Sequence, residues 1–311
     1  MIANLSEITD LNNLELVAAH VTEGFITGLH KSPFHGFSSE FNEHRLYNKG
    51  ESTRHIDWKL YARSEKLFVK RYEDESNLRC NIVIDTSSSM KYPQSGKFNK
   101  LEMSVVCAAA MINLLRSQRD AVSVTLFDKE IYFASDCKVS ATHAKMLFSK
   151  LEDIVRDRNF DTPDKSVEAP SPTGGIASCL HQVAENTHKR SLILIFSDMM
   201  DDGSEEEVFS ALQHLRHAKH DVILFHVMDK KTELDFDFEN RPYKFVDMEN
   251  GGQIALNPLE YKEIYRELSS GFCTRLQNHC GMYEMDYVAA DVALPFKEIL
   301  APFLIKRAVL H

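Results

Sequence analysis

An acidic residue and two serines follow a short apolar segment, and together they could hold a metal ion. Residues 82–84 read Ile-Val-Ile, and Asp85 then opens an Asp-x-Ser-x-Ser motif that continues with Ser87 and Ser89. A short apolar run of this kind is typical of a buried strand in a parallel sheet, and ligands bind at the carboxyl ends of such strands. Because carboxylate and hydroxyl oxygens suit hard cations, the motif predicts a Mg²⁺ site, with Mn²⁺ or Ca²⁺ as alternative cations.

Two later polar positions complete the predicted set of ligands. Thr173 stands at the entry of a predicted helix over 174–188, and Asp198 follows a predicted strand over 191–197. Parallel strands end at the same edge of a sheet, and the loops that enter the helices gather at that edge too. The expected metal ligands are Asp85, Ser87, Ser89, Thr173 and Asp198.

The same residues also have ordinary structural interpretations. A strand that ends in Asp and Ser often turns and caps the next helix, Thr173 fits a plain N-cap, and Asp198 fits a loop carboxylate. An enzymatic alternative is a metal-dependent hydrolase that uses the same cation as a Lewis acid. Such an enzyme needs a base or nucleophile beside the metal, and the three site loops contain no Lys, His or Cys, with Lys91 the nearest. We therefore predict a protein that is not an enzyme.

Strand and helix patterns alternate from residue 80 onward, which predicts an α/β fold with a mainly parallel sheet covered by helices on both faces. Only two residues separate the strands predicted over 121–127 and 130–134, so we expect a hairpin that adds one antiparallel edge strand. The other predicted elements are strands 80–85, 191–197, 222–228 and 282–288, helices 98–117, 142–155, 174–188, 205–219, 258–279 and 294–306, and a short hairpin around 249–252.

The first 77 residues differ from the rest of the chain. Apolar residues recur at helical spacing over 11–30, whereas 34–76 combines many charges and aromatics with short alternating runs. This pattern predicts a small N-terminal helix and a β-rich module. We therefore expect two domains, 1–77 and 78–311, the second ending in a C-terminal helix.

Composition restricts the location and the partners of the protein. The formal net charge of −10 disfavours nucleic acid or an anionic membrane surface as the main partner. The longest uncharged apolar stretch, Val105 to Leu115, is far shorter than the roughly 20 residues that span a bilayer. The N-terminus has no signal-peptide pattern, and the six cysteines form no Cys-x-x-Cys motif. We expect a cytoplasmic protein without membrane insertion.

The predicted ligand set resembles the metal-ion-dependent adhesion site of von Willebrand factor A domains. All five positions match: Asp85, Ser87 and Ser89 form the Asp-x-Ser-x-Ser motif, and Thr173 and Asp198 are the later Thr and Asp. The resemblance implies a doubly wound sheet and a Mg²⁺ ion bound directly by the two serines. It further implies that the threonine and the aspartates act directly or through water. One coordination position then stays open for an acidic residue of a partner.

A second resemblance covers nearly the whole chain. The residues that carry it lie in the N-terminal module and in the tail: Gly36, Ser38, Glu40, Phe41, Glu43, Arg45, Tyr47, Gly50, Glu51, Arg54, Ile56, Asp57, Trp58, Lys59, Tyr61, Ala62, Arg63, Lys66, Leu67, Val69, Lys70, Tyr72 and Glu73, with Gly252, Asn257, Pro258, Tyr265, Pro295, Phe303, Leu304 and Arg307 in the tail. These residues are similar to the signature of the bacterial domain-of-unknown-function-58 family. This resemblance implies a MoxR-type AAA+ ATPase, or that enzyme's client, as partner, in chaperone-like maturation of client proteins.

Overall fold

The computed structural model describes residues 13–28, 44–46, 61, 63, 67–70, 78–94, 98–156, 175–200, 203–249 and 251–301. The chain forms two compact units, one of Met1–His30 with Leu78–His311 and the other of Lys31–Asn77. The smaller unit contains strands β1 (His44–Leu46) and β2 (Phe68–Lys70), which pair antiparallel. Most of the module expected over 34–76 lies outside the described residues. The larger unit includes the N-terminal helix, whereas the sequence predicts this helix in one domain with that module.

A six-stranded sheet forms the centre of the larger unit. Its order is β10-β7-β6-β3-β4-β5, and every neighbouring pair is parallel except β4 with β5. This confirms the predicted α/β fold with a mainly parallel sheet and one antiparallel edge strand. The strands are β3 (Arg79–Asp85), β4 (Ala121–Phe127), β5 (Ile131–Ala134), β6 (Leu192–Ser197), β7 (Asp221–Met228) and β10 (Asp286–Asp291).

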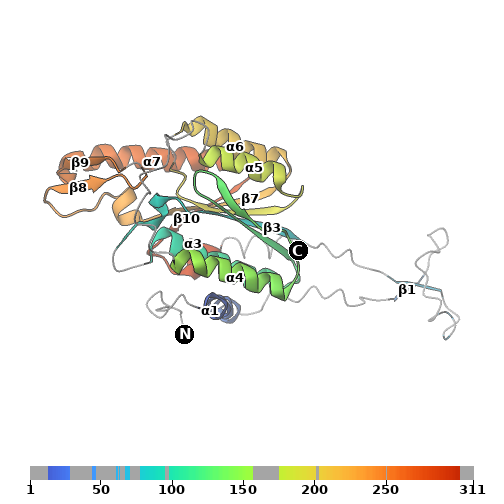
Figure 1. Cartoon of the computed structure of the whole chain (residues 1–311). Coiled ribbons are helices and arrows are strands. Elements are labelled where there is room, and N and C mark those ends of the chain that lie inside the picture. Colours follow the sequence, from blue (N-terminus) through green and yellow to red (C-terminus); the bar gives the residue numbers. More distant parts are fainter. Residues whose placement is uncertain are drawn as a thin grey trace. The chain divides into compact units, whose positions relative to one another are not determined.

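Helices cover both faces of this sheet, which is why its inner strands are buried along almost their whole length and are mostly apolar. In Figure 1, α5, α6 and α7 lie on one face and α3 and α4 on the other, with α1 packed outside them. An ion pair of 2.8 Å between Arg116 and Glu15 joins α3 to α1. The helices are α1 (Leu14–Gly28), α3 (Lys100–Ser117), α4 (Ala141–Arg156), α5 (Ile176–Asn186), α6 (Glu205–His217) and α7 (Pro258–Met282).

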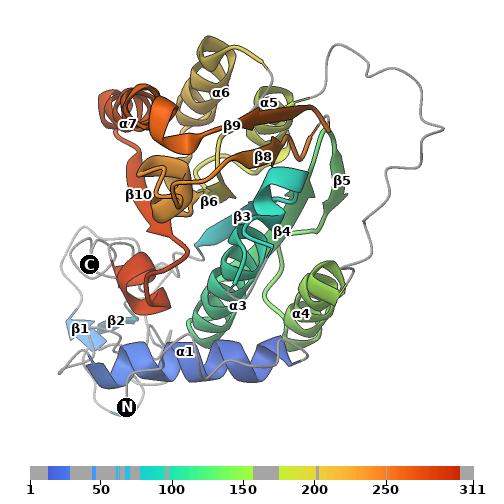
Figure 2. The ribbon, with the colours of Figure 1, turned by 90° about the vertical axis from the view of Figure 1, so that its left-hand side faces the viewer.

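A second hairpin precedes α7 and leads directly into it (Figure 2). Strands β8 (Tyr243–Val246) and β9 (Gln253–Leu256) pair antiparallel, as the sequence predicts around 249–252. After α7, the strand expected over 282–288 begins only at Asp286. Helix α7 continues to Met282, and Glu284 then adopts a positive φ of 53° that turns the chain toward β10.

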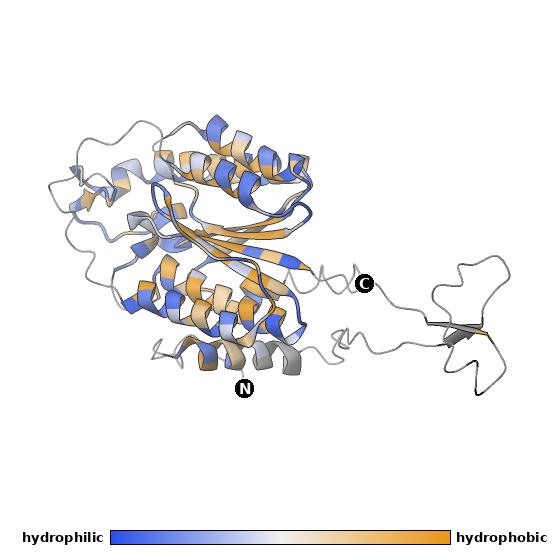
Figure 3. Ribbon diagram, turned by 45° about the vertical axis from the view of Figure 1, so that its right-hand side comes forward, coloured by the Kyte–Doolittle hydropathy of each residue, from blue (hydrophilic) through white to orange (hydrophobic). Residues whose placement is uncertain are grey.

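The hydrophobic core lies on both sides of the sheet. Figure 3 shows apolar residues along the strands and on the helix faces turned toward them. Phe196 of β6 and Phe225 of β7 are paired in register and stack with their ring centroids 4.5 Å apart. Within the described ranges, no helix combines the length and the apolar character needed to cross a membrane.

A capping box fixes the start of α3. The Asn99 side chain accepts a hydrogen bond of 2.7 Å from the Glu102 backbone N–H, and the Glu102 carboxylate accepts one of 3.1 Å from the Asn99 N–H. We expect Asn99→Ala to lower the free energy of unfolding by about 1 kcal/mol in urea denaturation. Asn99→Ser keeps a capping oxygen and should lose much less. Equal losses in the two variants would show that the cap contributes nothing.

Candidate metal centre

Two buried aspartates lie at the topological switch point of the sheet, where two adjacent strands connect to neighbours on opposite sides. Strands β3 and β6 are adjacent and parallel, and the chain leaves β3 toward β4 on one side and β6 toward β7 on the other. Asp85 is the last residue of β3, and Asp198 directly follows β6. The Asp85 side chain is inaccessible to solvent, and that of Asp198 is nearly so. This switch point is where open α/β sheets bind their ligands.

The Asp85 carboxylate accepts two hydrogen bonds from its neighbours. Its Oδ1 accepts from the Ser87 backbone N–H at 2.9 Å, and its Oδ2 accepts from the Ser197 hydroxyl at 2.6 Å. Burial, together with the negative charge of Asp198, nevertheless raises the pKa of Asp85 to about 7. The two carboxylates therefore repel each other in a desolvated place, and a cation between them would relieve that repulsion.

Two serine hydroxyls lie close together next to the Asp85 carboxylate. After Asp85 the chain turns through a short 3₁₀ helix, η3 (Ser88–Lys91), which brings Ser87 Oγ and Ser89 Oγ to 3.1 Å from each other. In an octahedral Mg²⁺ site with bonds of about 2.0–2.1 Å, adjacent ligand oxygens are about 2.9 Å apart. The separation of the two hydroxyls therefore fits neighbouring positions around one small cation.

A fully buried lysine, which sequence reasoning missed, is bonded to Asp198. Lys100 of α3 donates to Asp198 Oδ2 at 2.7 Å and to Glu233 Oε1 at 2.6 Å. Glu233 comes from η4 (Lys230–Leu234), which follows β7. Burial alone would lower the pKa of Lys100, but the two carboxylates outweigh it and the pKa is raised. The ammonium stays charged and neutralises part of the negative charge around the centre.

A buried histidine that was not predicted from the sequence lies behind Asp198. The Nε2 of His226 lies 3.0 Å from the Asp198 carbonyl oxygen, which only accepts, so Nε2 carries the proton. Its Nδ1 then accepts from the Tyr287 hydroxyl at 2.8 Å. Burial lowers the pKa of His226 to about 4, so the ring is neutral near pH 7. His226 thus holds the Asp198 backbone in place and has no lone pair left for a substrate.

Four of the five predicted ligands gather at this edge of the sheet: Asp85, Ser87, Ser89 and Asp198. Thr173 lies outside the described residues, which resume at Gly175 just before α5. In the part of the chain that the structure describes, no three His, Cys, Asp or Glu side chains cluster in a way that could hold a metal ion. A metal at these four residues would therefore need the serine hydroxyls as ligands. The 3.1 Å separation of the two hydroxyl oxygens is compatible with that role.

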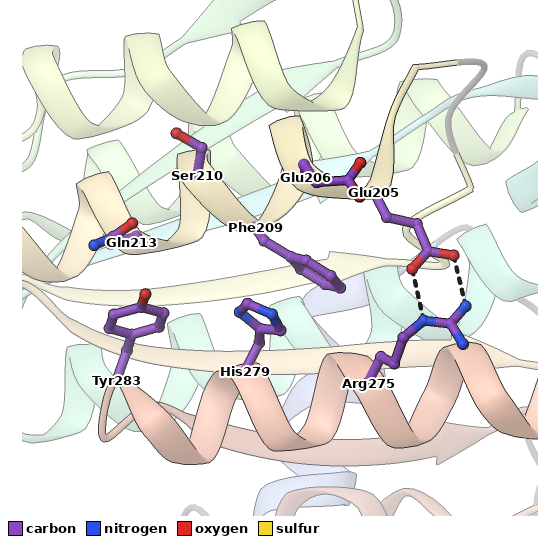
Figure 4. A pocket seen from close by; sticks show the side chains of 8 residues that line it. All are labelled: Glu205, Glu206, Phe209, Ser210, Gln213, Arg275, His279 and Tyr283. Atoms are coloured by element: carbon purple, nitrogen blue, oxygen red, sulfur yellow. Dashed lines mark hydrogen bonds and ion pairs between the residues drawn. The ribbon is translucent and has the colours of Figure 1, made fainter.

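A separate surface groove of about 660 Å³ lies between α6 and α7. Figure 4 shows Arg275 of α7 against Glu205 of α6, where two hydrogen bonds of 2.7 and 2.8 Å form a bidentate ion pair. Phe209 and His279 stack beside this pair, with their ring centroids 3.9 Å apart. The groove is open to solvent, and its lining includes none of the predicted metal ligands.

The comparisons with known proteins place the chain in a family. Residues 43–267 match the family model described as "Protein of unknown function DUF58". The chain belongs to this family. Among curated relatives, uncharacterized protein Rv1480 of Mycobacterium tuberculosis and uncharacterized protein Mb1516 of Mycobacterium bovis are each 21% identical over 222 residues. The matched segment is 71% of this chain, and the chain spans 65% of the length of each relative.

Two solved structures are also similar to this DUF58 protein. The conserved hypothetical protein BatB from Bacteroides thetaiotaomicron has a TM-score of 0.46 at 14% identity, covering 75% of this chain and all of that one. An aerotolerance-related membrane protein from Bacteroides fragilis has a TM-score of 0.42 at 16% identity, covering 74% of this chain and 99% of that one.

Proposed function

We propose that this DUF58 protein is a metal-dependent protein-binding module whose larger unit is a von Willebrand factor A-like domain. The observation that carries the proposal is the pair of hydroxyls of Ser87 and Ser89, which lie 3.1 Å apart next to the buried carboxylate of Asp85. The position of these residues at the switch point of the sheet supports the same conclusion.

Each residue has a role in the proposed site. Ser87 and Ser89 would bind Mg²⁺ directly through their hydroxyls, while Asp85 and Asp198 supply negative charge directly or through water. Thr173 is proposed as the fifth ligand on the strength of the sequence alone. The cation, when bound, supplies an electrophilic centre for the carboxylate of a partner, since two of its ligands are neutral. Mn²⁺ and Ca²⁺ are alternative occupants.

The groups next to the centre support binding rather than catalysis. The ammonium of Lys100 is bonded to two carboxylates, and both ring nitrogens of His226 are engaged. Neither group offers the lone pair that a general base or nucleophile requires. We therefore propose a non-enzymatic role.

The proposed partner is a protein that presents an acidic side chain. By its resemblance to its family, we propose a MoxR-type AAA+ ATPase or the client of that enzyme, in chaperone-like maturation. The net charge of −10 supports a protein partner over nucleic acid.

Ser87→Ala is expected to weaken Mg²⁺ binding about tenfold or more, because it removes one ligand oxygen. Isothermal titration calorimetry measures the dissociation constant. Ser88→Ala is the matched control, since Ser88 adjoins Ser87 but is not a predicted ligand. Equal affinities in the two variants would contradict the proposed ligand set.

Capture of the partner from source cells tests the binding role. We expect the wild-type protein to retain a MoxR-type ATPase or its client with Mg²⁺ but not with EDTA, and Ser87→Ala to lose it while Ser88→Ala keeps it. The same partner in all four samples would refute the metal dependence. Mg²⁺-dependent turnover of a phosphoester that Ser87→Ala abolishes would instead support a hydrolase.

A further inference from the structure

The turn between β8 and β9 brings an acidic side chain of this chain to the metal centre. Asp247 and Gly252 close the turn with a backbone hydrogen bond of 2.7 Å, and the Glu249 N–H donates to the Asp247 carboxylate at 2.8 Å. Gly251 adopts a φ of +72°, which favours glycine. In Figure 1 the hairpin extends beyond the ends of the sheet strands. The turn is thus shaped locally, and Glu249 lies on it.

Glu249 contacts the residue that supplies one of the proposed ligand hydroxyls. Its Oε1 accepts a hydrogen bond of 2.9 Å from the Ser89 backbone N–H, across 160 residues of sequence. The Ser89 hydroxyl belongs to the same residue and lies 3.1 Å from Ser87 Oγ. The half-buried carboxylate of Glu249 therefore sits next to the place where the cation would bind.

Near Glu249, two negative groups oppose one positive group. The nearby charged groups are the carboxylates of Asp128 and Asp198 and the ammonium of Lys129. Among the described residues, no ion pair includes Glu249, whose Oε1 accepts a hydrogen bond from the Ser89 N–H. A divalent cation at Ser87 and Ser89 would turn this unfavourable grouping into a favourable one.

We propose that Glu249 is an internal ligand of the metal, and that it fills the coordination position which a partner's acidic residue takes. This inference rests on the proposed metal site. Its consequence is that the partner competes with the β8–β9 hairpin, so binding of the partner's carboxylate releases the hairpin from the edge of the sheet. The partner's carboxylate and the Glu249 carboxylate would then compete for the same position on the metal.

The test uses Mn²⁺ as a paramagnetic replacement for Mg²⁺ on the full chain and on Glu249→Gln. The glutamine keeps an oxygen that accepts from Ser89 N–H but removes the charge, so a purely structural role of Glu249 is preserved. We expect Glu249→Gln to bind Mn²⁺ about tenfold more weakly, because a charged ligand is lost. We also expect a higher water-proton relaxation rate per bound Mn²⁺, because a water molecule takes the position that Glu249 leaves.

Acetate serves as the probe for the partner's carboxylate. Acetate should displace the bound water and so reduce the water-proton relaxation rate of the Mn²⁺ complex. Less acetate should be needed for Glu249→Gln than for wild type, because no internal carboxylate competes. Glu239→Gln is the matched control, because Glu239 is an exposed carboxylate paired with Arg241 at the surface, and its Mn²⁺ affinity should stay within about twofold of wild type.

The possible failures are distinguishable. If wild type and Glu249→Gln bind Mn²⁺ with the same affinity, relaxation and response to acetate, Glu249 only caps the Ser89 amide and the inference is wrong while the metal site stands. If neither binds Mn²⁺, the proposed metal site itself is wrong, and the inference falls with it.

Discussion

Replacement of Lys100 by methionine is expected to lower the free energy of unfolding by about 3–5 kcal/mol. The methionine fills a similar volume but leaves the carboxylates of Asp198 and Glu233 next to each other without their shared cation. Lys100 is inaccessible and Asp198 nearly so, so water cannot replace the lost ammonium. Urea denaturation followed by circular dichroism in EDTA measures the loss without any contribution from metal.

Arg275→Met provides the control for this prediction. Arg275 makes a bidentate ion pair with Glu205, but 52% and 39% of the two side chains are exposed, so its loss should cost less than about 1 kcal/mol. The double variant Lys100→Met with Glu233→Gln should recover part of the stability, because one of the two unpaired charges is gone. Similar small losses for Lys100→Met and Arg275→Met would contradict the structural role of the buried lysine.

Asp85→Asn is expected to weaken Mg²⁺ binding by about 10–100-fold while leaving the metal-free protein at least as stable as wild type. The stability of wild type is reduced by burying the Asp85 carboxylate and by its repulsion from Asp198. Asparagine removes the charge, and its amide oxygen still accepts from the Ser87 N–H. In EDTA we expect a free energy of unfolding that rises or stays within about 0.5 kcal/mol of the wild-type value.

Calorimetry with Mg²⁺ and denaturation in EDTA must be done on the same preparation of Asp85→Asn. Asp136→Asn is the control for loss of one negative charge, because Asp136 is exposed and paired with Lys138 at the surface. We expect Asp136→Asn to bind Mg²⁺ as wild type does. A large loss of metal-free stability in Asp85→Asn would show that the aspartate is a structural cap rather than a site residue.

Much of the larger unit could be predicted from sequence, because its strands are buried on both faces and its helices are amphipathic. The positions of Asp85 and Asp198 could be predicted because each follows an apolar run, and the change from apolar to polar residues marks the carboxyl end of a strand. The end of α7 was harder, because the helix continues through Gly281 and the chain turns only at the positive φ of Glu284.

Lys100, His226 and Glu249 could not be predicted, because each reaches the centre from an element remote in sequence. One signal for Lys100 was present: it shares a helix face with Ser104 and Cys107, all buried, which is unusual for a lysine. No comparable signal marks Glu249. Its position depends on how the β8–β9 hairpin packs against the sheet edge, which local patterns do not encode.

The order of strands in the sheet has a consequence for how the protein is made. Asp85 and its partner Ser197 lie 112 residues apart, on strands that become neighbours only after β4, β5 and the intervening helices have been synthesised. An emerging chain that has not reached β6 therefore contains both serines but lacks Asp198. At the proposed site, Mg²⁺ would stabilise only a chain that has paired β3 with β6, and it would therefore act late in assembly rather than early in folding.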